Sequence, residues 1–142
     1  MVGMMPAELA SQLRPALLRL TRLIRNQRVD MSVTLTQLSA LATLRKHGPM
    51  SAGELAGVER VQPPSMTKVL ALLEDRGLVT RQPHPTDRRQ AIIVLAQPGI
   101  DLLDSERRSW DAWLSRRLAE LTEDEQALLL SVVPVLDKLA EQ

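Results

Sequence analysis

Two short runs of β-prone residues flank a stretch that carries two adjacent arginines. The runs are Leu78–Gln82 and Ala91–Leu95, and His84–Gln90 lies between them. Runs of this length around a stretch containing Pro and Asp predict a β-hairpin. Arg88 and Arg89 at its tip gain little from burial, but they gain much by reaching phosphates or a narrow, negative minor groove. This hairpin constrains the fold strongly, because its charged tip must lie outside the hydrophobic core.

A short helix is predicted before this hairpin. Ser51 and Glu54 fit a Ser-x-x-Glu capping box, which starts a helix that runs through Val58 or Glu59. We expect Leu55 and Val58 to be its buried residues.

A second helix follows and begins near Pro63 or Pro64, since a first-turn amide has no intrahelical partner to lose. Gly77 closes it, because glycine adopts a left-handed conformation without strain. A tight turn at residues 60–62 joins the two helices into a helix-turn-helix, and the hairpin behind it completes the pattern of a winged helix-turn-helix. The buried stripe of the second helix is expected to be Met66, Val69, Leu70 and Leu73.

Apolar periodicity predicts four further helices. The helix predicted at residues 35–46 has two candidate N-caps, Thr34, with Gln37 as its capping-box partner, and Thr36. Gly48 ends this helix. Pro134 is expected to kink the last helix or to break its hydrogen-bond ladder. The helices are predicted at residues 6–28, at 35–46, at about 100–119 after a lead-in at 97–99, and from the Thr122–Glu125 capping box to about 141.

The predicted architecture is mainly α with a small β-hairpin, a winged helix-turn-helix flanked by N- and C-terminal dimerisation helices. Residues 1–32 are the N-terminal dimerisation helix, 33–96 the DNA-binding region and 97–142 the C-terminal dimerisation helices, within one structural domain. The terminal helices carry more leucine and valine than the central region can cover, so a symmetric homodimer is expected. Two-fold symmetry would place two recognition helices in successive major grooves of a pseudo-palindromic site.

Charge is distributed unevenly along the chain although the net charge is only +1. Residues 1–35 carry five arginines against two acids, and residues 36–95 carry eight basic residues against five acids. Residues 101–142 carry five basic residues against ten acids. The positive end would steer the molecule onto DNA, whereas ordinary solvated surface charge predicts no such segregation.

Composition limits the compartment and the chemistry. The chain has no cysteine, which excludes disulfides and thiolate zinc sites and fits a reducing compartment. No apolar run is long enough to span a bilayer, so a cytoplasmic protein without membrane contact is expected. His47 and His84 are too isolated for a metal site, and no phosphate-binding glycine loop occurs, so neither an enzyme nor a cofactor is expected.

The order of these elements and two motifs resemble the MarR family of bacterial and archaeal transcription regulators. Leu73–Arg81 reads Leu-Glu-Asp-Arg-Gly-Leu-Val-Thr-Arg, and Pro85–Arg89 contains Asp-x-Arg. The resemblance covers nearly the whole chain, including Leu55, Ala56, Leu95 and Gly99. It implies a homodimer that usually represses its target promoters and often releases them when a small molecule binds.

The resemblance also implies roles at the hairpin tip. Asp87 and Arg89 look like the family's Asp-x-Arg pair, in which the acid orients the loop and the arginine enters the minor groove. His84 stands where an aspartate is common, Gln97 where a threonine often precedes the glycine, and Pro63–Pro64 is unusual in a recognition helix. The two prolines bear on which base edges are read and leave the fold unaffected.

Ten residues of the helix-turn-helix and wing are expected to be at DNA. Ser65, Thr67 and Lys68 favour DNA as a cluster, although each alone also fits a solvated helix surface. Ser51 could bond a phosphate or simply cap its helix. Gln62 could bond adenine or serve the turn. The full set is Ser51, Gln62, Pro64, Ser65, Thr67, Lys68, Arg81, Asp87, Arg88 and Arg89.

A small aromatic or phenolic ligand, such as an aromatic acid, is a further expected partner. By position, Arg19, Thr36 and Trp110 resemble a pocket in which related proteins hold aromatic acids. A tryptophan face beside a guanidinium suits a planar carboxylate, whereas plain core packing accounts for Trp113 better and for Trp110 equally well. The alternative to DNA binding is a winged-helix module for protein contacts, which would expect an apolar recognition helix and no wing arginines.

Overall fold

The structure is a computed structural model that describes residues 3–141. The elements in chain order are α1 (Pro6–Arg25), α2 (Leu35–His47), β1 (Met50–Ser51), α3 (Ala52–Glu59), α4 (Pro63–Asp75), β2 (Val79–Pro83), β3 (Ala91–Leu95), α5 (Gln97–Leu118) and α6 (Glu123–Ala140). The predicted mainly α fold with a small hairpin is confirmed. None of the helices in these residues combines the length and apolar character that a bilayer span requires.

The elements fall into two compact units. The winged unit comprises residues 29–107, from the loop before α2 to the middle of α5. The helical unit comprises the chain up to residue 28 and from residue 108 onward, which includes α1, the end of α5 and α6. Within the helical unit, no residue of α1 or α6 is buried.

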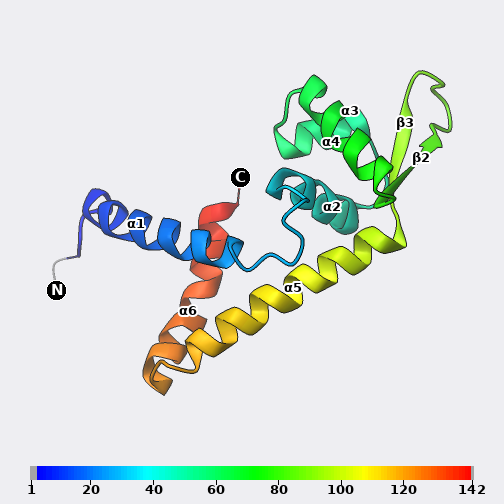
Figure 1. The fold of residues 1–142 in the computed structure, drawn as a ribbon. Helices are drawn as coiled ribbons and strands as arrows, with labels where there is room; N and C mark the ends of the chain where they lie inside the picture. The colour runs from blue at the N-terminus through cyan, green and yellow to red at the C-terminus, as the bar shows by residue number, and fades with distance from the viewer. Residues whose placement is uncertain (1–2, 142) are drawn as a thin grey trace. The chain divides into compact units, whose positions relative to one another are not determined.

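In the winged unit, helices α2, α3 and α4 pack against a small antiparallel sheet. The sheet has the strand order β1-β3-β2, and Arg81 of β2 lies opposite Ile93 of β3. The β2–β3 hairpin projects beyond the helices (Figure 1). The core of the winged unit is formed by apolar side chains of its helices and its sheet, among them Leu41, Leu44, Leu55, Met66, Leu70, Leu73 and Ile93.

Local capping signals determine the helix ends. The Thr34 hydroxyl accepts the backbone N–H of Gln37, and the Gln37 side chain accepts that of Thr34, so the predicted capping box is confirmed. Gly77 adopts φ +70° after α4, as expected for a left-handed position past a helix end. Arg60 also adopts a left-handed conformation, with φ 55°, in the turn between α3 and α4. This backbone conformation costs roughly 1–2 kcal/mol for a residue that has a Cβ. Nothing in the sequence indicated that Arg60 would adopt it.

Several local predictions were wrong. Val58 is 51% exposed, because the buried face of α3 is centred between Leu55 and Ala56 and Val58 lies on the far side of Leu55. Strand β1 was not predicted, since two residues are too short to show periodicity. Helix α5 begins at Gln97, because Pro98 fits a first helical turn. Helix α1 ends three residues early, at Arg25.

Helix α6 is continuous from Glu123 to Ala140 with Pro134 inside it, so the bond that the proline nitrogen cannot donate is lost from the ladder without ending the helix. The Thr122–Glu125 capping box at its start is confirmed. Val69 of α4 is only partly buried, although Met66, Leu70 and Leu73 are buried as predicted.

Candidate nucleic-acid interface

The start of α4 is the exposed end of the helix-turn-helix. Pro63 and Pro64 occupy the first two helical positions, and Met66 faces the core. The predicted contact residues Gln62, Pro64, Ser65, Thr67 and Lys68 are all exposed on this end. Gln62 makes no side-chain capping bond within the described residues, while the Thr67 hydroxyl donates to the Pro63 carbonyl at 3.0 Å. The structure thus brings these five residues together on one accessible surface.

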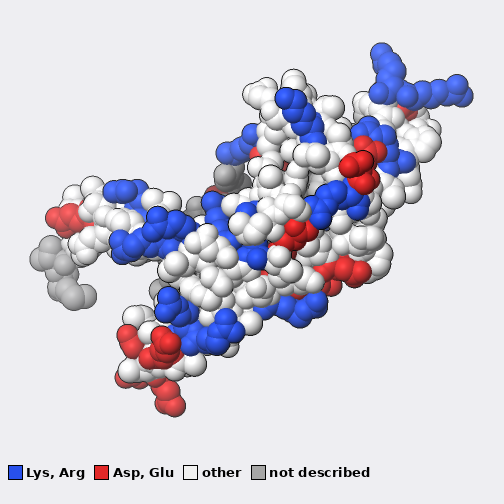
Figure 2. All heavy atoms as spheres, viewed as in Figure 1, with Lys and Arg blue, Asp and Glu red and all other residues white. Residues whose placement is uncertain are grey.

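Asp87 organises the tip of the hairpin. Its Oδ1 accepts the backbone N–H of Arg89 at 3.0 Å and the Arg89 Nε–H at 3.4 Å. The side chain of Arg89 is nevertheless 92% exposed. Basic side chains gather at this tip (Figure 2), which places positive charge at the end of the wing.

His84 supports the same loop, a role that was not predicted from the sequence. Its Nδ1 accepts the backbone N–H groups of Thr86 at 3.2 Å and Asp87 at 3.0 Å. An aspartate carboxylate at this position could accept the same two bonds, so histidine substitutes for the family's common residue. The signal available in the sequence was a loop start followed by Pro85, where a side-chain acceptor commonly closes a turn.

Arg81 is held by the recognition helix. Its Nε and Nη2 donate to the two carboxylate oxygens of Glu74 in α4 at 2.9 and 2.8 Å. The hydrogen bonds from Arg81 hold the pKa of the Glu74 carboxyl below its ordinary value of 4.5, and they raise the pKa of the Arg81 guanidinium. This bidentate pair ties strand β2 to α4, so Arg81 positions the wing whether or not it also touches DNA.

Replacing Glu74 by glutamine is expected to destabilise the protein near neutral pH and to lose that effect in acid. The pKa of Glu74 is lower in the folded state than in the unfolded state, so the ion pair contributes fully above about pH 4.5. Its contribution is lost as the pH falls through the folded-state pKa. Urea unfolding of both proteins from about pH 7 to about pH 3 should show the difference in unfolding free energy shrinking.

The neighbouring variant Asp75→Asn is the control, because Asp75 is exposed and has no ion pair among the described residues. A Glu74→Gln difference that stays constant with pH would contradict a role for the charged pair.

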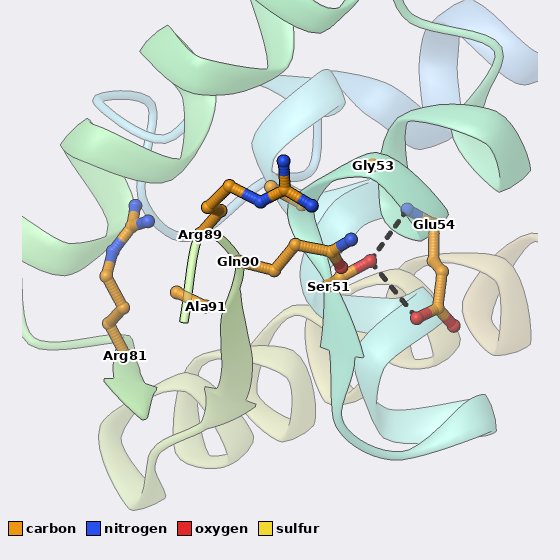
Figure 3. Close-up of a pocket in the computed structure, with 8 residues that line it drawn as sticks. Ser51, Gly53, Glu54, Arg81, Arg89, Gln90 and Ala91 are labelled. Carbon is orange, nitrogen blue, oxygen red and sulfur yellow. Dashed lines mark hydrogen bonds between the residues drawn. The ribbon is translucent and has the colours of Figure 1, made fainter. Parts of the chain in front are cut away.

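An open hollow of about 650 Å³ separates the start of α3 from the hairpin. Ser51 is only 5% exposed, and its hydroxyl accepts the Glu54 backbone N–H and donates to the Glu54 carboxylate, each at 3.1 Å. Arg89 and Gln90 extend from the hairpin toward the side where Ser51 lies (Figure 3). Capping by Ser51 is confirmed, although the Glu54 side chain bonds the Ser51 hydroxyl and not its backbone.

The residues predicted to bind a small molecule are distributed over both units. Arg19 and Trp110 belong to the helical unit, and Thr36 belongs to α2 of the winged unit. The Trp110 Nε1 is buried and has no hydrogen-bond partner in the described part of the chain. Arg117 lies over the ring of Trp113, 5.3 Å from its centre. Residues 3–141 contain no group of acidic, histidine or cysteine side chains that could hold a metal ion.

Comparisons with known proteins agree with this geometry. A sequence profile of the MarR family matches residues 33–91. The chain is 43% identical over 136 residues to Mb0904, an HTH-type transcriptional regulator of Mycobacterium bovis, covering 96% of this chain and 95% of that protein. It is 37% identical over 93 residues to the transcriptional repressor NicR of Pseudomonas putida, covering 66% of this chain and 59% of NicR. The crystal structure of apo MarR from E. coli superposes with a TM-score of 0.77 at 23% identity, covering 95% and 98% of the two chains.

Proposed function

Because this chain belongs to the MarR family of helix-turn-helix transcription regulators, we propose that it is a homodimeric repressor that binds a pseudo-palindromic site in duplex DNA. Its relatives and its fold are those of regulators, not of enzymes. Repression is the function stated for the related protein NicR. Since the DNA partner lies in the cytoplasm of a bacterial or archaeal cell, we place the protein there.

The start of α4 would lie in the major groove while the wing reaches the adjacent minor groove. One observation carries this proposal furthest: Arg89 is fixed at its backbone by Asp87, yet its guanidinium is almost fully exposed. A charged group held ready in this way is suited to a narrow, negative minor groove. The proposed contact set is Ser51, Gln62, Pro64, Ser65, Thr67, Lys68, Arg81, Asp87, Arg88 and Arg89.

The helical unit offers the surface for a second copy. An apolar hollow of about 560 Å³ lies among α1, α5 and α6 of this unit, lined by leucines and valines that include Leu20, Leu114, Leu129, Val133 and Leu136. Further leucines of α1 and α6 are exposed, among them Leu17, Leu128, Leu130 and Leu139. So large an apolar surface favours burial against another molecule, and a two-fold axis would set two recognition helices about 34–36 Å apart.

A small aromatic acid that releases the DNA is the proposed effector, with Arg19 and Trp110 of the helical unit as its contacts. The support is chemical: the buried Trp110 Nε1 lacks an acceptor within the described residues, and a carboxylate could supply one. Isothermal titration with a series of aromatic acids, repeated on Trp110→Phe, tests this part separately from DNA binding.

Selection of bound fragments from genomic DNA, followed by titration at several salt concentrations, tests the central proposal. With roughly 6 to 10 phosphate contacts per dimer, affinity should fall by about 10³- to 10⁵-fold between about 50 and 200 mM salt. Sedimentation of the complex should show two copies per selected site. A flat salt dependence, or no enriched fragment, would favour the winged-helix protein-contact module instead.

A further inference from the structure

Arg76 follows the last turn of the recognition helix and is held by residues that are distant in sequence. Its Nη2 donates to Oδ2 of Asp30 at 2.7 Å, and its Nη1 donates to the Ser32 hydroxyl. The other oxygen of Asp30 accepts the Ser32 backbone N–H at 2.9 Å and the Ser32 hydroxyl at 2.5 Å. The bonds from Ser32, and next those from Arg76, lower the pKa of Asp30, so the carboxylate is charged at neutral pH.

Glu106 fixes the backbone of the same loop to α5. It is 1% exposed, and its carboxylate accepts the backbone N–H of Val29 at 3.1 and 3.0 Å and that of Asp30 at 3.0 Å. A buried carboxylate is tolerated only where donors replace its water, and two backbone amides supply them here. The loop is therefore anchored by bonds that do not depend on Arg76.

These contacts form a continuous polar connection inside the winged unit. It runs from Glu106 in α5, through the backbone and carboxylate of Asp30, to Arg76 at the end of α4. Helix α4 has 13 residues and is thus about 20 Å long. The proposed base contacts lie in the first two turns of α4, while Arg76 lies beyond its last turn. The bonds from Arg76 to Asp30 and Ser32 therefore hold the end of the helix that points away from the groove.

We propose that Arg76 is a positioning residue for operator recognition. It acts through its ion pair with Asp30, which lies on the loop that Glu106 anchors. It sets the direction in which α4 leaves the core, and its guanidinium is not a contact to DNA. Recognition needs side chains held within about 0.5 Å and 10–20° of their working geometry, and one fixed end of a short helix determines where its other end points. The inference rests on the proposed function.

The test uses Arg76→Gln, Arg76→Lys and Asp30→Asn in the full-length protein, with duplex DNA selected by the unaltered protein. Arg76→Gln is expected to weaken binding of the selected site by about tenfold, while binding of random-sequence duplex changes little. The slope of log affinity against log salt should stay the same, because no phosphate contact is lost. Arg76→Lys should recover part of the affinity, since an ammonium can still bond Asp30.

Asp30→Asn should reproduce the loss, and the double variant Asp30→Asn/Arg76→Gln should lose little more than either single variant. Asp30→Asn keeps the shape of the side chain, so it remains informative if Arg76→Gln fails to fold. The matched control is Arg45→Gln, which breaks the similarly exposed Arg45–Asp104 pair of 2.6 Å in the same unit and should leave affinity unchanged.

Two results would overturn the inference and leave the proposed function standing. One is unchanged affinity of folded Arg76→Gln or Asp30→Asn for the selected site. The other is a salt slope reduced by about one in Arg76→Gln, with equal loss on random duplex, which would make Arg76 a phosphate contact. If the unaltered protein binds no duplex at all, the proposed function is overturned together with the inference.

Discussion

Replacing Arg89 by alanine is expected to weaken operator binding by about tenfold to a hundredfold, with folding and dimerisation unchanged. The guanidinium is 92% exposed and meets only Asp87 at 3.4 Å within the described residues, so the fold has little to lose. In a complex the same group would enter a narrow minor groove, where the negative potential is focused. Because the proposed dimer has two wings, a loss of about 0.7–1.4 kcal/mol at each wing gives this change, near the lower end of the roughly 1–3 kcal/mol that one specific arginine contact contributes. Gel-shift titration on a selected site at fixed salt measures the change.

The neighbouring variant Arg88→Ala is the matched control, because it removes the same charge from the same exposed tip. If Arg88 touches only phosphate, its loss should weaken all duplexes equally and reduce the salt slope, whereas Arg89→Ala should weaken the selected site preferentially. Unchanged titration of the Arg89→Ala variant would reject a DNA contact for Arg89.

The features predicted correctly from sequence are those whose causes lie within a few residues. Thr34 and Gln37, like Thr122 and Glu125, are three positions apart, so each capping box is visible without knowledge of the fold. The position of Gly77 and the two runs of the hairpin likewise depend on neighbouring residues. The MarR resemblance, now confirmed by the comparisons, extended these local signals to the order of the elements.

The features missed depend on pairings between distant segments. Asp30 and Arg76 are 46 positions apart, and Val29 and Glu106 are 77 apart. The periodicity of apolar residues contains no information about such partners. In the sequence, Glu106 cannot be distinguished from the solvent-exposed acids of its helix. Arg81 shows the same limit over seven positions, since only the reversal at Gly77 brings it back to Glu74. The sequence identified the charged groups of the site but not which of them are already paired.

Replacing Gly99 by alanine is expected to destabilise the winged unit by about 3 kcal/mol, because the new methyl group has no room. A Cβ at this position would lie 2.4 Å from the Leu78 carbonyl oxygen and 2.7 Å from Cδ1 of Leu95. The Leu95 side chain can rotate, but the carbonyl is fixed, since it accepts the Ala96 N–H at 3.0 Å. Urea unfolding compared with the unaltered protein measures the loss.

Gly53→Ala is the matched control, because Gly53 lies inside α3 with no atom within 4 Å of an added Cβ. It should stabilise the protein by about 0.5–1 kcal/mol through helix propensity. Equal stability of the two variants would show that the close approach at Gly99 relaxes at little cost. If the destabilisation is as large as expected, the overlap between the new methyl group and the Leu78 carbonyl can be removed only when α5 moves away from Leu78. Leu78 is the residue that joins α4 to β2. Because the recognition helix α4 ends at that junction and the wing begins there, Gly99→Ala should weaken DNA binding even in the fraction of molecules that stays folded.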